Sequence, residues 1–141
     1  MVSPAPAPAL PGISPGLQAR LDAGLAAVEA MLHARVDHDD PFIAEANAHL
    51  LAAGGKRFRP LLTLLAAELG DGINDDVIAA AAGVELTHLA SLYHDDVMDD
   101  ADTRRGVPSA NAKYDNSTAI LVGDLLFGTA SDIIADLGRE A

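Results

Sequence analysis

Residues 77–106 read VIAAAAGVELTHLASLYHDDVMDDADTRRG, and the rest of the expected architecture is arranged around them. The apolar, small-residue run at the start of this stretch predicts a buried helix. Five carboxylates follow within eight positions at its C-terminal end: Asp95, Asp96, Asp99, Asp100 and Asp102. Because a helix C-terminus carries partial negative charge, an acidic cluster placed there needs compensating positive charge. Mg²⁺ is the natural candidate, since it binds one or two carboxylates together with substrate phosphates.

Helical spacing distributes these acids over more than one face. Asp95 and Asp99 are four residues apart and share one face, and His88 lies two turns earlier on nearly the same face. Asp96 is about 100° further round the helix and is expected at the edge of the site. A solvated acidic helix end is the alternative interpretation. The pair of arginines that follows favours a metal and phosphate site, because guanidinium groups bind phosphate oxygens in a bidentate manner.

The cationic residues are few and concentrated. Of nine lysines and arginines, five fall in two short motifs: Lys56, Arg57, Arg59, Arg104 and Arg105. The first motif, GGKRFRP at residues 54–60, combines glycines, which let a ligand approach the backbone, with bases near an expected helix N-terminus. Its alternative interpretation is a glycine helix cap followed by a solvated basic turn. In a chain this acidic, two cationic clusters point to an anionic ligand.

The composition limits the class of protein. Half of the 141 residues are hydrophobic but only 4% are aromatic, which favours closely packed helices in one modest domain. The absence of cysteine excludes disulfides and thiolate metal sites. A net charge of −12 argues against nonspecific binding to nucleic acid or to anionic membranes. The sequence has neither an uncharged apolar run of the ~18–20 residues that a membrane span needs nor a signal-peptide pattern, so we expect a cytoplasmic protein.

Taken in order, the chain predicts an all-α fold. Residues 1–16 are rich in alanine and proline and are expected to form a disordered tail, and residues 17–141 a helical domain. Apolar periodicity, capping residues and breaks predict about five helices, at residues 17–36, 42–53, 61–69, 74–99 and 117–134, with a short turn or helix at 111–116. No strand pattern is recognisable. We expect a partial bundle with one exposed face.

Together these motifs resemble those of the trans-type polyprenyl diphosphate synthases. Residues 55–60 are similar to the family's Gly-Lys-x-x-Arg-Pro motif, and residues 94–106 to its first aspartate-rich motif with the arginines that follow it. His88 and the Gly123-Asp124 pair match in position. The resemblance extends over nearly the whole expected helical domain and implies part of the isoprenoid-synthase helical bundle.

The resemblance also implies a reaction and its participants. Isopentenyl diphosphate would be bound by Lys56, Arg59, His88 and Arg105. Mg²⁺ on an allylic diphosphate would be held by Asp95, Asp96 and Asp99, with Arg104 contacting the same diphosphate. These last four residues are the expected catalytic residues. Loss of pyrophosphate would give an allylic cation, which the isopentenyl double bond attacks head-to-tail before a proton is lost.

Side-chain size leads to an expectation about the product. Ala90 and Ser91, about one turn before Asp95, are small where short-chain members of the family tend to carry aromatic residues. An open tunnel and a medium- or long-chain polyprenyl diphosphate are therefore expected, with Tyr93 and Phe127 as the residues that could obstruct the tunnel.

Members of the family are longer, and the chain resembles only their N-terminal half. The family's second aspartate-rich motif and its lysine-, threonine- and glutamine-containing elements do not follow residue 124. Three interpretations stay open: a piece of a full enzyme, one subunit of a split enzyme whose partner supplies the C-terminal half, or a catalytically incomplete diphosphate-binding or assembly subunit. The resemblance further implies a homodimer.

Overall fold

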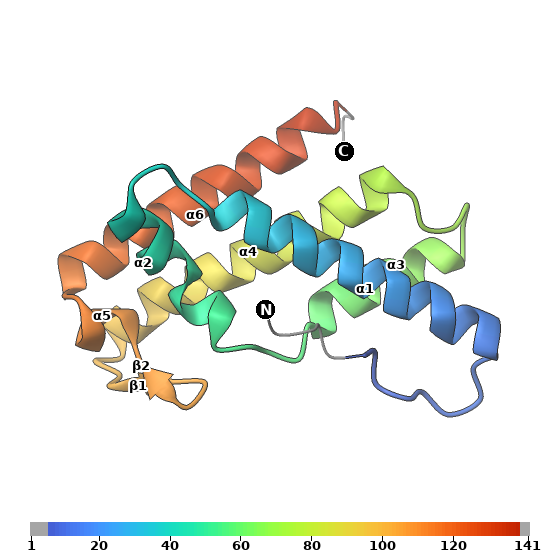
Figure 1. Cartoon of the computed structure of the whole chain (residues 1–141), viewed down its shortest axis with the longest axis horizontal. Coiled ribbons are helices and arrows are strands. Elements are labelled where there is room, and N and C mark those ends of the chain that lie inside the picture. The colour runs from blue at the N-terminus through green and yellow to red at the C-terminus, as the bar shows by residue number, and fades with distance from the viewer. Residues whose placement is uncertain (1–5, 139–141) are drawn as a thin grey trace.

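The computed structural model describes residues 6–138 and contains six helices in that range. They are α1 (Pro15–Val36), α2 (Pro41–Ala52), α3 (Phe58–Glu68), α4 (Asp75–Met98), α5 (Ala110–Lys113) and α6 (Asn116–Asp136). Helix α4 runs through the middle of the molecule, in contact with α1, α3, α5 and α6 (Figure 1). The predicted all-α fold and the central place of the helix before the aspartates are confirmed.

Four helix starts follow from capping residues in the sequence. Ser14, Asp40, Asn74 and Asp115 each accept a hydrogen bond from a backbone amide in the first turn of α1, α2, α4 and α6. Each side chain satisfies an N–H group that the first helical turn leaves without an intrahelical partner. The observed starts therefore lie within two residues of the predicted ones.

Helix α3 begins earlier than expected. It starts at Phe58, three residues before the predicted Leu61, and so includes Pro60. A proline in the first turn removes no intrahelical hydrogen bond, because the N–H groups there have no partner within the helix. The residue before the helix, Arg57, has a left-handed backbone with a φ of 51°.

The segment after α4, predicted as a plain loop, contains a short hairpin. Strand β1 (Thr103–Arg104) pairs antiparallel with β2 (Val107–Pro108). The two turn residues, Arg105 and Gly106, have φ values of 55° and 77°. Two left-handed residues match the twist of paired strands, and glycine takes this conformation without strain. The hairpin carries both arginines of the second cationic motif.

The predicted tail, residues 1–16, lies partly outside the described residues, which begin at residue 6. In the described part, Ala7 is buried, and its amide donates a 2.9 Å hydrogen bond to Oδ1 of Asp22 in α1. The segment therefore packs on α1 at this point. The expected disorder and the domain boundary at residue 17 stay predictions.

Close packing of α4 against α6 depends on small residues. Ala81, Ala82 and Ala90 of α4 are fully buried in the main hydrophobic cluster. On α6, Gly123 lies against the ring of His94, so closely that a methyl group at position 123 would overlap the imidazole. The two helices can lie side by side because these positions carry almost no side chain.

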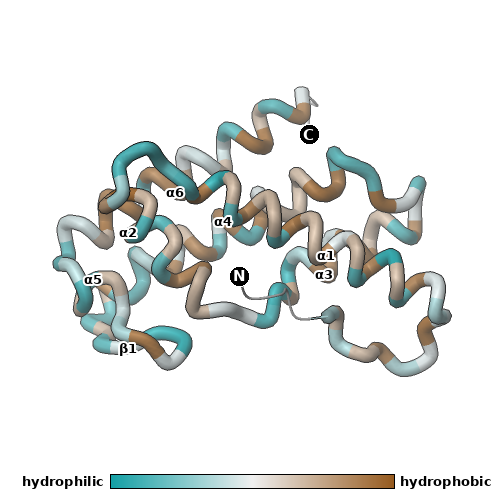
Figure 2. The backbone as a smooth tube through the Cα atoms, viewed as in Figure 1, coloured by the Kyte–Doolittle hydropathy of each residue, from teal (hydrophilic) through white to brown (hydrophobic). Residues whose placement is uncertain are grey.

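The outer side of α6 keeps an apolar surface. Ile120, Leu121 and Leu125 are between 41 and 66% exposed, and hydrophobic and hydrophilic segments alternate along the helix in Figure 2. Among the described residues, α6 is the one helix that is long and apolar enough to cross a membrane. The core helix of a soluble protein can have the same length and apolar content, so these two properties do not identify a membrane span.

Two glycines of α6 test this packing. We expect Gly123→Ala to lower the free energy of unfolding by about 1–3 kcal/mol, because the added methyl group must displace the His94 ring. Gly128 has open space around its Cα, so Gly128→Ala should raise stability by about 0.5–1 kcal/mol through helix propensity. Urea unfolding followed by circular dichroism measures both. Equal effects of the two substitutions would contradict the described packing.

Candidate diphosphate and metal site

The two acids predicted to share a face do so at the end of α4. Asp95 is partly exposed and lies one turn before Asp99, which is exposed and forms the C-terminal cap. The same half-open face of α4 carries His88 and Ser91. Two accessible carboxylates one turn apart can hold a divalent cation while leaving coordination positions for other oxygens.

Asp96 lies in a different environment from the one expected. Its side chain is fully buried, whereas the sequence placed it at the edge of a metal site. Oδ1 accepts hydrogen bonds from Nη2 of Arg104 at 2.6 Å and from Nε at 3.0 Å. This pairing raises the pKa of Arg104, mainly through the hydrogen bonds to Asp96. In this structure Asp96 therefore holds an arginine beside the other two acids.

Arg105 connects the two cationic motifs. Its Nη1 atom donates to the carbonyl of Leu50 at 2.9 Å and also to the carbonyl of Gly54. Both carbonyls lie at the C-terminal end of α2, where helical carbonyls have no intrahelical partner and a cation is favourable. Burial and the nearby charge of Arg57 lower the pKa of Arg105. Through this contact the hairpin after α4 is fastened to the loop after α2.

The glycines of the GGKRFRP loop make room for side chains of the protein itself. Gly55 has a φ of 150°, and a Cβ atom there would lie 2.7 Å from Nη1 of Arg57 and 3.1 Å from Nη2 of Arg105. Lys56 and Arg59, on either side of Arg57, are exposed. In the first motif, Lys56 and Arg59 are therefore exposed cations, while the side chain of Arg57 is turned into the protein.

His88 lies among the cations predicted to bind the same substrate. Its pKa is lowered, first by burial and then by the positive charges of Arg59, Arg105 and Arg104, while Asp95 acts in the opposite direction. Burial and the neighbouring arginines therefore disfavour the protonated ring, and an imidazole N–H can donate a hydrogen bond to an anion. These interactions bring the predicted site residues of three separate segments to one region.

An ion cluster beneath this region was not predicted. Arg57 donates to both carboxylate oxygens of Glu29, at 2.8 and 3.0 Å, and its Nη1 atom lies 3.4 Å from Oε1 of Glu85. Glu85 is only 2% exposed, and burial raises its pKa. A lone glutamate inside the apolar run of α4 was the available indication in the sequence, but spacing alone could not identify its partner.

An acid within an apolar helix suggests a partly buried group with a partner, but the structure bears out only the partner for Asp124. Its side chain is 61% exposed, and Oδ1 lies 3.2 Å from Nε2 of His94. The helical period turns position 124 outward because Gly123 occupies the contact with α4.

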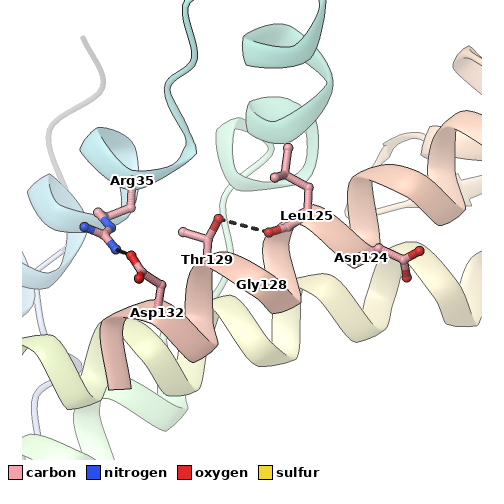
Figure 3. Close-up of a pocket in the computed structure, with 6 residues that line it drawn as sticks. All are labelled: Arg35, Asp124, Leu125, Gly128, Thr129 and Asp132. Atoms are coloured by element: carbon pink, nitrogen blue, oxygen red, sulfur yellow. Dashed lines mark hydrogen bonds and ion pairs between the residues drawn. The ribbon is translucent and has the colours of Figure 1, made fainter. Parts of the chain in front are cut away.

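A shallow hollow of about 630 Å³ on the outer side of α6 lies apart from the predicted site residues. Figure 3 shows Arg35 and Asp132 pointing toward one another, and their atoms Nη2 and Oδ2 are 2.7 Å apart. Thr129 donates to the carbonyl of Leu125 on the hollow's floor. Both polar pairs are satisfied within the chain, and Asp124 adds an exposed carboxylate to the lining, so the hollow does not suit an anionic ligand.

The available ligands suit a cation that is shared with a substrate. Within residues 6–138, no group of three or more histidine, cysteine or acidic side chains gathers closely enough to enclose a metal ion. Asp95 and Asp99 supply two carboxylates. That number fits Mg²⁺, which completes its coordination with water and with phosphate oxygens.

Relatives of known type are similar to this chain in sequence. The nonaprenyl diphosphate synthase of Mycobacterium tuberculosis is 46% identical in an alignment 140 positions long, which covers 96% of this chain and 42% of that protein. Component 2 of the heptaprenyl diphosphate synthase of Geobacillus stearothermophilus is 47% identical over 82% of this chain and 36% of its own length. The chain thus spans about two-fifths of the length of the curated relatives it matches.

Solved structures agree with this similarity. The polyprenyl synthase of Caulobacter crescentus, complexed with calcium and isoprenyl diphosphate, superposes with a TM-score of 0.82 at 37% identity, over 94% of this chain and 40% of that one. The decaprenyl diphosphate synthase of Rhodobacter capsulatus has a TM-score of 0.81 at 43% identity, over 88% and 38%. Residues 40–141 also match the polyprenyl synthetase family. The chain belongs to the polyprenyl synthetase family.

Proposed function

We propose that this chain supplies one wall of a Mg²⁺-dependent prenyltransferase, which condenses isopentenyl diphosphate with an allylic diphosphate to a medium- or long-chain polyprenyl diphosphate. The observation that carries the proposal is the contact of Arg105 with the carbonyls of Leu50 and Gly54. It joins the cationic loop after α2 to the hairpin after α4. Two anion-binding motifs and a pair of acids thereby border one region.

The two substrates would use different parts of this region. Lys56, Arg59, Arg105 and His88 bind the diphosphate of isopentenyl diphosphate, with His88 as a hydrogen-bond donor. Asp95 and Asp99 hold Mg²⁺ against the allylic diphosphate, and Arg104 contacts the same diphosphate. Bound Mg²⁺ neutralises charge on the pyrophosphate leaving group.

Asp96 takes a supporting part in this proposal. Its buried carboxylate accepts two hydrogen bonds from Arg104. Asp96 therefore contributes to the metal site indirectly, by orienting this arginine. An arginine fixed in this way stabilises negative charge that develops on the leaving group. The carbocation that remains requires an apolar cavity without nucleophilic water.

The product tunnel would run along α4 before the acids. Ala90 is small and Ser91 only partly buried. The hydroxyl of Tyr93, in contrast, donates to the carbonyl of Ala46 and accepts from the amide of Leu50, so this ring is committed to the contact with α2. Phe127, whose ring centroid lies 5.4 Å from that of His94, is left as the side chain that could limit the tunnel.

The second wall would come from elements that the longer relatives possess beyond the matched region. Either the same polypeptide or a partner chain would supply them, and the apolar surface of α6 is suited to contact such elements or a second copy in a homodimer. A net charge of −12 disfavours nucleic acid as a partner. We place the assembled enzyme in the cytoplasm.

A second function is a catalytically incomplete subunit that binds diphosphate or assists assembly. It is favoured as an alternative by the partial match to the relatives, since the chain spans about two-fifths of their length. It differs from the first in one respect: the chain would bind diphosphate with Mg²⁺, yet give no product with any complementing partner.

Product formation separates the two functions. The purified chain is incubated with Mg²⁺, an allylic diphosphate and labelled isopentenyl diphosphate, alone and together with the C-terminal part of the M. tuberculosis relative. We expect labelled polyprenyl diphosphate in the second mixture and none after chelation of Mg²⁺. Binding without product in either mixture would support the incomplete subunit. A chain that binds neither diphosphate would contradict both functions.

Substitutions of the aspartates should show which carboxylate stabilises the fold and which one binds Mg²⁺. Asp96→Asn leaves Arg104 without its charged partner and should lower the free energy of unfolding by about 2 kcal/mol, less than for a fully buried pair because Arg104 is partly solvated. Asp95→Asn removes negative charge from a helix C-terminus and should leave stability unchanged or raised by about 0.3–1 kcal/mol. Urea unfolding without Mg²⁺ measures both.

The same variants are then titrated with Mg²⁺ and allylic diphosphate. Asp95→Asn should lose Mg²⁺-dependent binding while staying as stable as the wild type. Asp100→Asn, at an exposed position just past the helix, serves as the control and should leave Mg²⁺-dependent binding unchanged. A stability loss for Asp95→Asn as large as that for Asp96→Asn would contradict the assignment.

A further inference from the structure

Arg57 is the cation of the GGKRFRP loop that faces the protein. Its side chain is only 11% exposed, while its neighbours Lys56 and Arg59 are exposed. The backbone at Arg57 is left-handed, a conformation that non-glycine residues seldom adopt and that the surroundings must stabilise. The resemblance to the Gly-Lys-x-x-Arg-Pro motif assigns no role to this position.

The guanidinium of Arg57 is held by two acids from two helices. Glu29 of α1 accepts two hydrogen bonds from it, and Glu85 of α4 a third. Burial of Glu29 acts to raise its pKa, but the hydrogen bonds and charge of Arg57 outweigh it, and the net pKa is lowered. A planar guanidinium can satisfy several acceptors at once, which a lysine ammonium cannot do in the same geometry.

The same guanidinium also fastens the loop to the end of α2. Its nitrogens lie 3.4 Å from the carbonyl of Gly54 and 3.5 Å from that of Leu51. Arg105 donates to the same Gly54 carbonyl. Two positive groups thus meet at one carbonyl oxygen, and the buried carboxylate of Glu85 is the nearby negative charge that offsets their repulsion.

We infer that Arg57, clamped by Glu29 and Glu85, is a positioning residue that fixes Lys56, Arg59 and Arg105 in the geometry needed to bind a diphosphate. Arg57 itself does not touch the ligand. The inference rests on the proposed function, because it concerns the site for isopentenyl diphosphate. A displacement of about 1 Å in a binding group can cost about a hundredfold in function, so loss of the clamp should be measurable.

Binding of isopentenyl diphosphate to the full chain, measured by isothermal titration calorimetry, tests the inference. Arg57→Gln should weaken binding about tenfold or more, and Arg57→Lys should recover part of the loss. Arg20→Gln is the matched control: it breaks another arginine–glutamate pair between helices, Arg20 with Glu68, away from the site. It should leave the affinity within about twofold of the wild type even if the unfolding temperature falls.

Glu85→Gln distinguishes positioning from simple electrostatics. The substitution keeps the volume and an acceptor for Arg57 but removes the negative charge between two arginines. If Glu85 only repelled the ligand, its neutralisation would tighten diphosphate binding. Positioning requires weaker binding, and tighter binding by Glu85→Gln would overturn the inference. This variant also provides the test if Arg57→Gln does not fold.

Amide hydrogen exchange of the loop tests the role of Arg57 without any ligand, and therefore independently of the proposed function. Without ligand, Arg57→Gln should speed the exchange of amides in residues 54–58 and leave those of α6 unchanged. A wild type that binds no isopentenyl diphosphate would refute the proposed function, and the exchange result alone would then decide whether Arg57 positions the loop. Unchanged loop exchange, or a folded Arg57→Gln variant that binds like the wild type, would overturn the inference.

Discussion

Concentration of negative charge at the C-terminal end of α4 is the constraint on which the arrangement of the site depends. Asp95, Asp96 and Asp99 lie where the helix dipole already disfavours anions. The hairpin after α4 turns back toward the helix end, and its Arg104 donates a hydrogen bond to the carboxylate of Asp96. Its next residue, Arg105, then reaches the carbonyls at the end of α2. The acids are thus offset by a local contact between residues 8 apart, and the adjacent arginine joins segments 55 residues apart.

The sequence predicted those parts of the site that depend on helical period and local chemistry. The spacing of Asp95 and Asp99 placed them on one face, and the capping residues placed four helix starts within two residues. It could not show which neighbouring face of α4 is buried, because that depends on packing with other helices. The same applies to Arg57, whose partners come from α1 and α4.

At Asp124, too, the sequence did not show which face of the helix is buried. An acid in an apolar helix suggests a buried, paired group, yet the buried position is that of the adjacent glycine, which accommodates the ring of His94. The hairpin was missed for a related reason. Two-residue strands are too short to show an alternating pattern, and only the left-handed turn at Arg105 and Gly106 defines them.

Each charged motif therefore pairs an outward group with an inward one. In the loop after α2, Lys56 and Arg59 are exposed and Arg57 is turned inward. At the end of α4, Asp95 and Asp99 are accessible and Asp96 is buried. Adjacent residues of like charge can take such different roles because a helical turn, or one left-handed residue, directs their side chains apart. The inward charges cost desolvation and must be fully paired, which fixes the backbone that carries the outward ones. Each of these two motifs thus combines exposed groups, which we propose bind the ligand, with a buried group that supports them.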